Sequence, residues 1–412
     1  MSDAVRNYLI VTASYWGFTL VDGALRMLVL FHFFKLGYSP FTLAFLFLLY
    51  EFAGILSNLI GGWLAVRFGI PRMLATGQLL QIAGLVMLSA LDPAWAVAIS
   101  VAYVVAAQGI AGVAKDLTKT ASKSAIKAVS KDGSKELFNL VAWFTGSKNA
   151  MKGVGFFLGG LLLETVGFRM ALWLMAGLLA VILVAGLLLL PRELGKAKGS
   201  RTVRELFAKS RGVNLLAAAR VFLFGARDVW FVVGLPVFLY AHGWSFLSVG
   251  AFLAFWTIGY GFIQAAAPRV VSRSDDGLTR EVPSAWQWSL GLMIIPLVLA
   301  VVLNTSAVPH PDWIIVAGLT LFGFAFAVNS SLHSYLILAY AGSEKAAEDV
   351  GFYYAANAAG RLVGILLSGL LYQVGGMTGC LLGSAAMLGL CWAITLTLPA
   401  RADAEALEGR AA

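Results

Sequence analysis

The chain has 412 residues, of which 60% are hydrophobic and 12% are charged, with a net charge of +9. Soluble domains carry about 25% charged residues, so this composition excludes two or three ordinary globular domains. Apolar runs of about 18 residues or more recur along the sequence, each long enough to cross a bilayer core about 30 Å thick. The sequence therefore predicts an all-α, multi-pass membrane protein that does not bind nucleic acid.

The apolar runs predict twelve transmembrane helices in two pseudo-symmetric six-helix bundles. The helices are expected at residues 7–34, 40–66, 72–91, 95–118, 137–163, 169–190, 213–240, 245–268, 285–304, 312–340, 350–373 and 377–398. The bundles are expected at 1–190 and 213–398, with a basic cytoplasmic linker at 191–212 and a disordered cytoplasmic tail at 399–412. Most basic residues then fall on one side, and by the positive-inside rule both termini lie in the cytoplasm. A cytoplasmic (inner) membrane protein in contact with lipid is expected.

The fifth span carries two lysines within its apolar sequence. Lys148 and Lys152 lie one helical turn apart beside Asn149, and like charges at this spacing repel. Each charge also costs about 2.5–3.5 kcal/mol near the bilayer centre. Such a pair is tolerable where it faces a watery cavity that a negative substrate enters. The alternative is that both lysines extend from a helix end to the interface.

The two halves of the sequence repeat. KGVGFFLGGLL, which begins at Lys152, matches RLVGILLSGLL, which begins at Arg361, and at nearly the same offset Asp22 falls on Asp228. Six-span repeats predict a substrate site at the bilayer midplane between the halves, with Lys152 and Arg361 facing each other across it. A chance match between apolar segments is the alternative.

Carboxylates within the spans have two possible roles. Asp22 and Arg26 share one helix face with Tyr15, and they either neutralise each other as an i,i+4 pair or serve transport. Glu51 is a carboxylate within the second span. Burial shifts such a group toward reversible protonation, but a structural bond to a neighbouring helix is an equal alternative. Asp228 in the seventh span is a third candidate proton carrier.

Further cations follow helical spacing in the fourth and seventh spans. Lys115 and Lys119 are expected to face the cavity, whereas Lys123 and Lys127 further along are expected to be solvated or to contact anionic lipid. Arg220 and Arg227 lie seven residues apart on one face. Arginine presents a planar fork that suits phosphate or carboxylate oxygens.

The tenth and eleventh spans add polar residues. Asn357 and Arg361 share a face with Tyr354 in the eleventh span. His333, one turn after Asn329, is expected to be a hydrogen-bonded core residue, and a proton relay is the alternative.

Cations outnumber carboxylates in the spans, which predicts a substrate with several negative charges. The eight cations are Arg26, Lys115, Lys119, Lys148, Lys152, Arg220, Arg227 and Arg361, and the four carboxylates are Asp22, Glu51, Asp116 and Asp228. The excess is expected to lack fixed counter-ions. Cys380 and Cys391 lie eleven residues apart on the last span, too far for a disulfide or a clustered thiolate site. They are expected to be small buried hydrophobes, and neither a metal nor a cofactor is expected.

The loop GGWLAVRFGIPR at 61–72 resembles the signature of the major facilitator superfamily. Gly62, Arg67, Gly69 and Arg72 match it, but Val66 replaces the usual acid. QGIAG and GFFLGG, in the fourth and fifth spans, resemble further motifs of that family. The resemblance implies the major facilitator fold and a gating role for the matching loop residues.

Four longer segments resemble ArsJ, the organoarsenical efflux permease family of that superfamily. They are residues 8–41, 114–127, 145–160 and 219–240. The resemblance implies export of 1-arseno-3-phosphoglycerate, made by a partner glyceraldehyde-3-phosphate dehydrogenase, and hence arsenate resistance. The residues alone indicate only a polyanion.

The sequence thus predicts a monomeric alternating-access exporter and not an enzyme. The substrate-binding residues are expected to be Tyr15, Arg26, Lys115, Lys119, Lys148, Asn149, Lys152, Arg220, Arg227, Asn357 and Arg361. Proton antiport is expected to use Asp22, Glu51 or Asp228. An organophosphate/phosphate exchanger would have the same site. An integral membrane enzyme is disfavoured because no H-E-x-x-H or paired-carboxylate motif is present, and a channel because repeats favour rocking.

Overall fold

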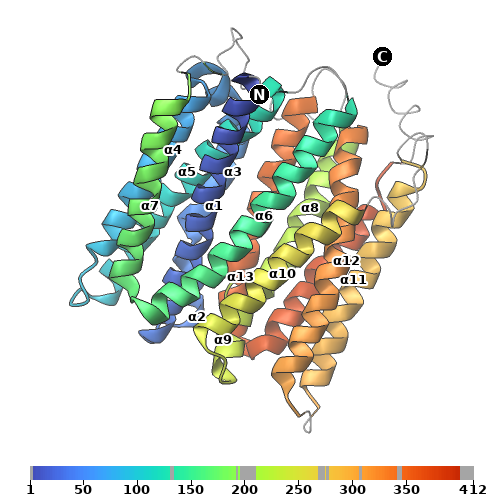
Figure 1. Ribbon diagram of the computed structural model, residues 1–412. Coiled ribbons are helices and arrows are strands. Elements are labelled where there is room, and N and C mark those ends of the chain that lie inside the picture. The colour runs from blue at the N-terminus through green and yellow to red at the C-terminus, as the bar shows by residue number, and fades with distance from the viewer. Residues whose placement is uncertain are drawn as a thin grey trace. The chain divides into compact units, whose positions relative to one another are not determined.

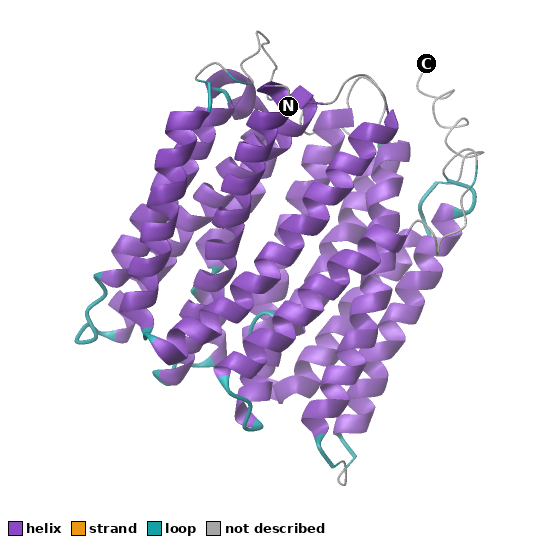
Figure 2. Ribbon diagram, in the orientation of Figure 1, coloured by secondary structure: helices purple, strands orange, loops and turns teal. Residues whose placement is uncertain are grey.

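The computed structural model describes residues 3–129, 134–191, 194, 210–267, 274, 278–305, 309–340 and 346–399, and side chains for these residues apart from 3–5, 60–67, 123–129, 134–145, 338 and 346–350. Every regular element in this part of the chain is an α-helix (Figure 2). The prediction of an all-α membrane protein is therefore confirmed.

The helices follow the apolar runs of the sequence (Figure 1). Their bounds are α1 Asp3–Lys35, α2 Pro40–Phe45, α3 Leu48–Phe68, α4 Ile70–Ser89, α5 Val97–Val129, α6 Ser134–Thr165, α7 Phe168–Leu189, α8 Arg211–Phe231, α9 Gly234–Ala241, α10 Phe246–Ala266, α11 Glu281–Leu303, α12 Pro311–Tyr340 and α13 Ala346–Thr395. Ser39 caps α2 and Ser210 caps α8, each hydroxyl accepting the amide N–H three residues on. Such caps satisfy amides that the first helical turn leaves without partners.

The helices differ from the twelve expected spans at three places. The span expected at 40–66 is divided into α2 and α3, and the one at 213–240 is divided into α8 and α9. In contrast, α13 covers both of the last two spans, with non-helical backbone at Gly376, where φ is 58°. Only glycine adopts such a conformation at little cost.

Nine segments within the described residues are long and apolar enough to cross a membrane. α6 is not among them, because Lys148, Asn149 and Lys152 lower its mean hydropathy. A helix that lies in sequence among membrane spans but carries this polarity is a functional candidate.

The first compact unit comprises residues 1–201 and 243–261. α1 packs against α5, α6 and α7 in this unit, and α5 also packs against α3 and α4. Its centre is apolar: Leu28, Val29 and Leu30 in α1 are wholly buried. The sequence expectation that the bundles are 1–190 and 213–398 stays a prediction.

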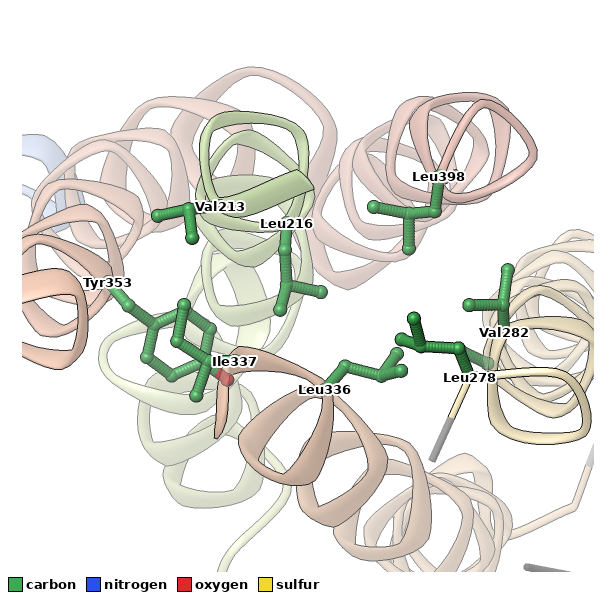
Figure 3. Packing of buried hydrophobic residues seen from close by; sticks show 9 residues of the cluster. Val213, Leu216, Leu278, Val282, Leu336, Ile337, Tyr353 and Leu398 are labelled. Atoms are coloured by element: carbon green, nitrogen blue, oxygen red, sulfur yellow. The ribbon is translucent and has the colours of Figure 1, made fainter. Parts of the chain in front are cut away.

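The second compact unit comprises residues 202–242 and 262–412. α13 packs against α8 and α11, and α11 also packs against α12. Figure 3 shows an apolar cluster in this unit, to which α8, α11, α12 and α13 all contribute. We call it the apolar cluster; its labelled members are Val213, Leu216, Leu278, Val282, Leu336, Ile337, Tyr353 and Leu398.

Both units contain close helix crossings that require glycine. A Cβ atom at Gly155 of α6 would overlap the Leu20 carbonyl oxygen of α1, and one at Gly364 of α13 would overlap the Gly225 carbonyl oxygen of α8. These glycines occupy equivalent positions in the sequence repeat. The second crossing brings Asp228 of α8 and Arg361 of α13 close together.

Candidate functional site

In the first unit, the charged residues of α1 are held by α3. Arg26 donates from Nη2 to Glu51 Oε1 at 2.5 Å, and both side chains are buried. Tyr50, the neighbour of Glu51, donates from its hydroxyl to Asp22 Oδ1 at 2.6 Å. Asp22 has no lysine or arginine nitrogen within 4 Å in the described part of the chain. The possible i,i+4 pair of Asp22 and Arg26 is therefore not formed, because each finds its partner on α3.

The α5 lysines share a single carboxylate. Lys119 Nζ lies 2.6 Å from Asp116 Oδ1 and 2.8 Å from Asn58 Oδ1 of α3. Lys115 Nζ lies 3.9 Å from the other Asp116 oxygen and also 3.9 Å from the centre of the Tyr50 ring. A cation over an aromatic face is attracted to it. These contacts place the α5 charges beside those of α1 and α3.

In the second unit, two arginines share Asp228. Arg227 lies 2.5 Å from Asp228 Oδ1 through Nη2, and Arg361 of α13 lies 3.2 Å from Oδ2 through Nε. Asp228 is wholly buried, whereas both arginine side chains retain some exposure. Both carboxylate oxygens are therefore engaged, and the group of three carries a formal charge of +1.

Unlike Arg26, Arg227 and Arg361, Arg220 has no carboxylate oxygen within 4 Å among the described residues. Its Nη1 donates to the Ser330 carbonyl oxygen at 3.0 Å. The guanidinium carbon lies 4.0 Å from the Phe224 ring centre and 4.7 Å from that of Tyr353. The side chain is only 3% exposed, so it is a buried charge surrounded by rings and carbonyl groups.

The α6 lysines are half-buried on the helix that crosses α1. Lys152 Nζ lies 5.6 Å from the centre of the Phe156 ring, and its backbone oxygen lies against Gly23 of α1. Lys148 and Asn149 are half-buried one turn earlier, where Trp16 of α1 donates to the Ser147 hydroxyl at 3.0 Å. This stretch of α6 therefore packs against the face of α1 that carries Trp16 and Gly23.

Of the remaining expected residues, Tyr15 is buried and Asn357 is half-buried, and the Oδ1 of Asn357 has no hydrogen-bond partner among the described residues. In the gating motif, Gly69 begins α4 with φ 78° and Arg72 is exposed. The surroundings of Gly62 and Arg67 lie outside the described residues. So do the side chains of Lys123 and Lys127.

One sequence prediction is wrong: His333 was expected to be hydrogen-bonded, but neither ring nitrogen has a partner among the described residues. The excess of cations over carboxylates was expected to lack fixed counter-ions, and that stays a prediction. In the described part of the chain five cations lie within 4 Å of only three carboxylates, Glu51, Asp116 and Asp228; the cations are Arg26, Lys115, Lys119, Arg227 and Arg361. Cys380 and Cys391 are buried thiols, as expected.

Sequence reasoning missed Tyr50. Its hydroxyl bonds Asp22 and its ring contacts Lys115, so it joins α1, α3 and α5. The one feature of the sequence that could have indicated Tyr50 is its position next to Glu51.

Comparisons with known proteins agree on the fold. The family model described as Major Facilitator Superfamily matches residues 8–303. A POT family transporter in complex with 5-aminolevulinic acid has TM-score 0.73 and 13% identity, over 95% of each chain. A mutant of the nucleoside transporter NupG has TM-score 0.70 and 14% identity, over 96% of this chain and 99% of that one. A peptide transporter POT in complex with sulfate has TM-score 0.68 and 15% identity, over 95% of this chain and 93% of that one. No curated protein matches the chain.

Proposed function

The chain belongs to the major facilitator superfamily of membrane transporters, and we propose that it exports a polyanionic organoarsenical, 1-arseno-3-phosphoglycerate, by alternating access. The transporter would lie in the cytoplasmic membrane with both termini in the cytoplasm, and it would act as a monomer. A glyceraldehyde-3-phosphate dehydrogenase would supply the substrate. Expression of both proteins would then confer resistance to arsenate.

The observation that carries the proposal is the sharing of one carboxylate between two cations, which occurs once in each unit. Asp116 lies between Lys115 and Lys119, and Asp228 lies between Arg227 and Arg361. Each group has one positive charge in excess. An arriving anion can compete for these side chains without leaving a carboxylate unpaired, because a second cation remains.

The polarity of α6 supports the same conclusion. Lys148 and Lys152 add two further positive charges to a helix that crosses α1 beside Asp22. A substrate with phosphate, arsenate and carboxylate oxygens offers an acceptor for each of these donors. A cationic or uncharged substrate would gain nothing from them.

Proton antiport is the proposed coupling, and Asp22 is the preferred carrier among the three candidates. Protonation of Asp228 would leave two arginines without their counter-ion, and protonation of Glu51 would do the same to Arg26. Among the described residues Asp22 is bonded to the Tyr50 hydroxyl alone, and a neutral carboxyl group can still accept that bond. Protonation therefore costs least at Asp22.

The test uses arsenate-sensitive cells that lack their own arsenic export and express the dehydrogenase together with this chain. Lys148→Gln or Lys152→Gln is expected to abolish arsenate resistance while the protein remains folded and inserted. Lys35→Gln, at an exposed position outside these groups, is the matched control and should retain resistance. Unchanged resistance in both α6 variants would refute the site assignment.

An organophosphate/phosphate exchanger is the second candidate, because the same shared-carboxylate groups would bind sugar phosphates. Everted vesicles that contain the protein separate the two functions. Uptake of the arsenical that depends on a pH gradient supports the exporter. Exchange of labelled phosphate for a sugar phosphate, without such dependence, supports the exchanger.

A further inference from the structure

The second unit contains a buried positive charge that the ion pairs above do not explain. Arg220 is 3% exposed, and its Nε has no hydrogen-bond partner in the described part of the chain. Arginine stays protonated in proteins, so its charge cannot be removed by loss of a proton. A buried charge without a carboxylate partner is expensive, and an anion that arrives at this position would offset it.

Two polar side chains of α12 near the Ser330 carbonyl that Arg220 contacts carry atoms without partners among the described residues. His333 and Asn329 are wholly buried and lie one helical turn apart, on the same face. Both ring nitrogens of His333 and the Oδ1 of Asn329 lack hydrogen bonds within the described residues. Ser330, whose carbonyl oxygen accepts from Arg220, lies between them in sequence. Because Arg220 contacts α12 at this residue, Arg220, Asn329 and His333 lie along the same stretch of the two helices.

This grouping is unusual because buried polar atoms nearly always have partners. The Nδ2 of Asn329 does donate to the Ser289 hydroxyl, at 2.8 Å, which fixes the side chain and leaves Oδ1 directed elsewhere. Water could satisfy the polar atoms, but it would not balance the charge of Arg220. The coincidence of a charge and unpartnered atoms therefore points to a charged ligand.

The available atoms define the chemistry of that ligand. Arg220 Nε–H and one imidazole N–H are donors, whereas Asn329 Oδ1 and the second imidazole nitrogen are acceptors. An oxyanion that also carries a hydroxyl group, such as hydrogen phosphate, satisfies both kinds of atom. Chloride would satisfy only the donors.

The apolar cluster closes one side of this grouping. Leu216 lies one turn from Arg220 along α8, and Leu336 and Ile337 lie one turn from His333 along α12 (Figure 3). Tyr353, also in the cluster, stacks on the guanidinium. Apolar walls lower the local dielectric constant and so strengthen the attraction between a cation and an anion.

We propose that Arg220, His333 and Asn329 form an oxyanion subsite that holds a phosphate-like group of the transported substrate. The proposal rests on the proposed function, because it names the residues that bind one end of the transported polyanion. It makes His333 and Asn329 substrate contacts, in addition to the basic side chains. It also gives Arg220 a role distinct from that of Arg227 and Arg361, which are held by Asp228.

The test measures the thermal unfolding of the purified full-length protein in detergent, with inorganic phosphate or with chloride at equal ionic strength. Phosphate is expected to raise the melting temperature of the wild type saturably, and chloride is not. Arg220→Gln and His333→Leu should each weaken the apparent phosphate affinity roughly 10- to 100-fold, as expected for loss of a hydrogen bond to a charged group. Arg169→Gln is the matched control, since that exposed arginine also donates to a carbonyl oxygen, of Ser89.

A second readout separates binding from a structural role. Leucine at position 333 removes two unpartnered buried atoms, so the phosphate-free melting temperature should stay the same or rise. His333→Asn and His333→Gln place an amide nitrogen near the positions of Nδ1 and Nε2, respectively, and one of them should restore part of the phosphate effect. If Arg220→Gln does not fold, Arg220→Lys keeps the charge and should weaken phosphate binding without abolishing it.

Two results would overturn the subsite: no phosphate effect in the wild type, or an undiminished effect in both Arg220→Gln and His333→Leu. If that happens while resistance still depends on Lys148 and Lys152, the proposed function stands without the subsite. If instead phosphate binding depends on Arg220 and His333 but the cells gain no arsenate resistance, the arsenical is the wrong substrate and the subsite stands.

Discussion

Asp22 and Asp228 occupy equivalent positions in the two halves of the sequence, yet their surroundings differ. Asp228 is bonded through both oxygens, to Arg227 and to Arg361. In the part of the chain that the structure describes, Asp22 accepts a single hydrogen bond, from the Tyr50 hydroxyl. The Arg26 side chain, one turn from Asp22, pairs with Glu51 instead.

The two halves therefore share their helix crossings, but we expect their equivalent carboxylates to have different roles. Asp228 is expected to hold cations in position for the anion, a role that requires permanent charge. Asp22 is expected to gain and lose a proton, which a neutral partner permits. The following substitutions test that division, from the largest expected effect on stability to the smallest.

Asp228→Asn should have the largest effect. It leaves Arg227 and Arg361 without their shared counter-ion, and removal of one partner from a buried pair costs about 3–5 kcal/mol. Thermal unfolding in detergent measures this loss, and transport should also cease. A loss below about 1 kcal/mol would mean that Asp228 does not hold the arginines.

The two helix crossings should respond alike. Gly155→Ala and Gly364→Ala each place a methyl group against a backbone oxygen of the partner helix, and overpacking of this kind costs about 1–3 kcal/mol. Gly177→Ala in α7 is the control, because nothing lies within 4 Å of its Cβ position. Thermal unfolding of the three variants would show whether the scaffolds are equivalent; a large difference between positions 155 and 364 would argue against it.

Tyr50→Phe should have a smaller effect. It removes the one hydrogen bond that Asp22 accepts, a bond between a hydroxyl and a charged group, and should cost about 1–2 kcal/mol. The ring remains for Lys115 to contact. Unfolding measurements on Tyr50→Phe, Asp22→Asn and the double variant give the coupling energy between the two side chains, and a value near zero would contradict the bond.

Asp22→Asn should change stability least, by less than about 1 kcal/mol, because an amide oxygen can accept the same bond. The substitution should instead affect the coupling of substrate transport to proton movement. Exchange of substrate across vesicle membranes should persist, while dependence on the pH gradient should disappear. If transport by Asp22→Asn still depends on the pH gradient, Asp22 is not the proton carrier and Glu51 becomes the candidate.

The sequence predicted the helices well because membrane spans are marked by length and hydropathy, which are local properties. It did not predict the break between α8 and α9. There the hydroxyl of Ser368, in α13, accepts the amide N–H groups of Val233 and Gly234. That hydroxyl compensates for the interrupted helix, and no local pattern places Ser368 near this position.

The candidate site was predicted only as a set of residues. The positions of the charges within spans follow from the sequence, but the choice of partner depends on contacts between helices. Asp22 and Arg26 have the spacing of a helical pair, and Arg26 instead meets Glu51. Likewise, Lys119 reaches Asn58 on α3. Such choices require the register of neighbouring helices, which spacing along one chain does not define.

The glycine within α13 has a consequence for handling the protein. Gly379 lies against the Leu371 carbonyl oxygen, so the chain folds back at Gly376 and the last two spans form a hairpin with almost no connecting loop. At that end only a short exposed stretch, residues 373–375, precedes the bend, which leaves little room for a protease, an epitope tag or an inserted fusion domain. A sequence inserted there would have to unwind two helices, and the hairpin should therefore remain intact in limited digestion after longer connections have been cut.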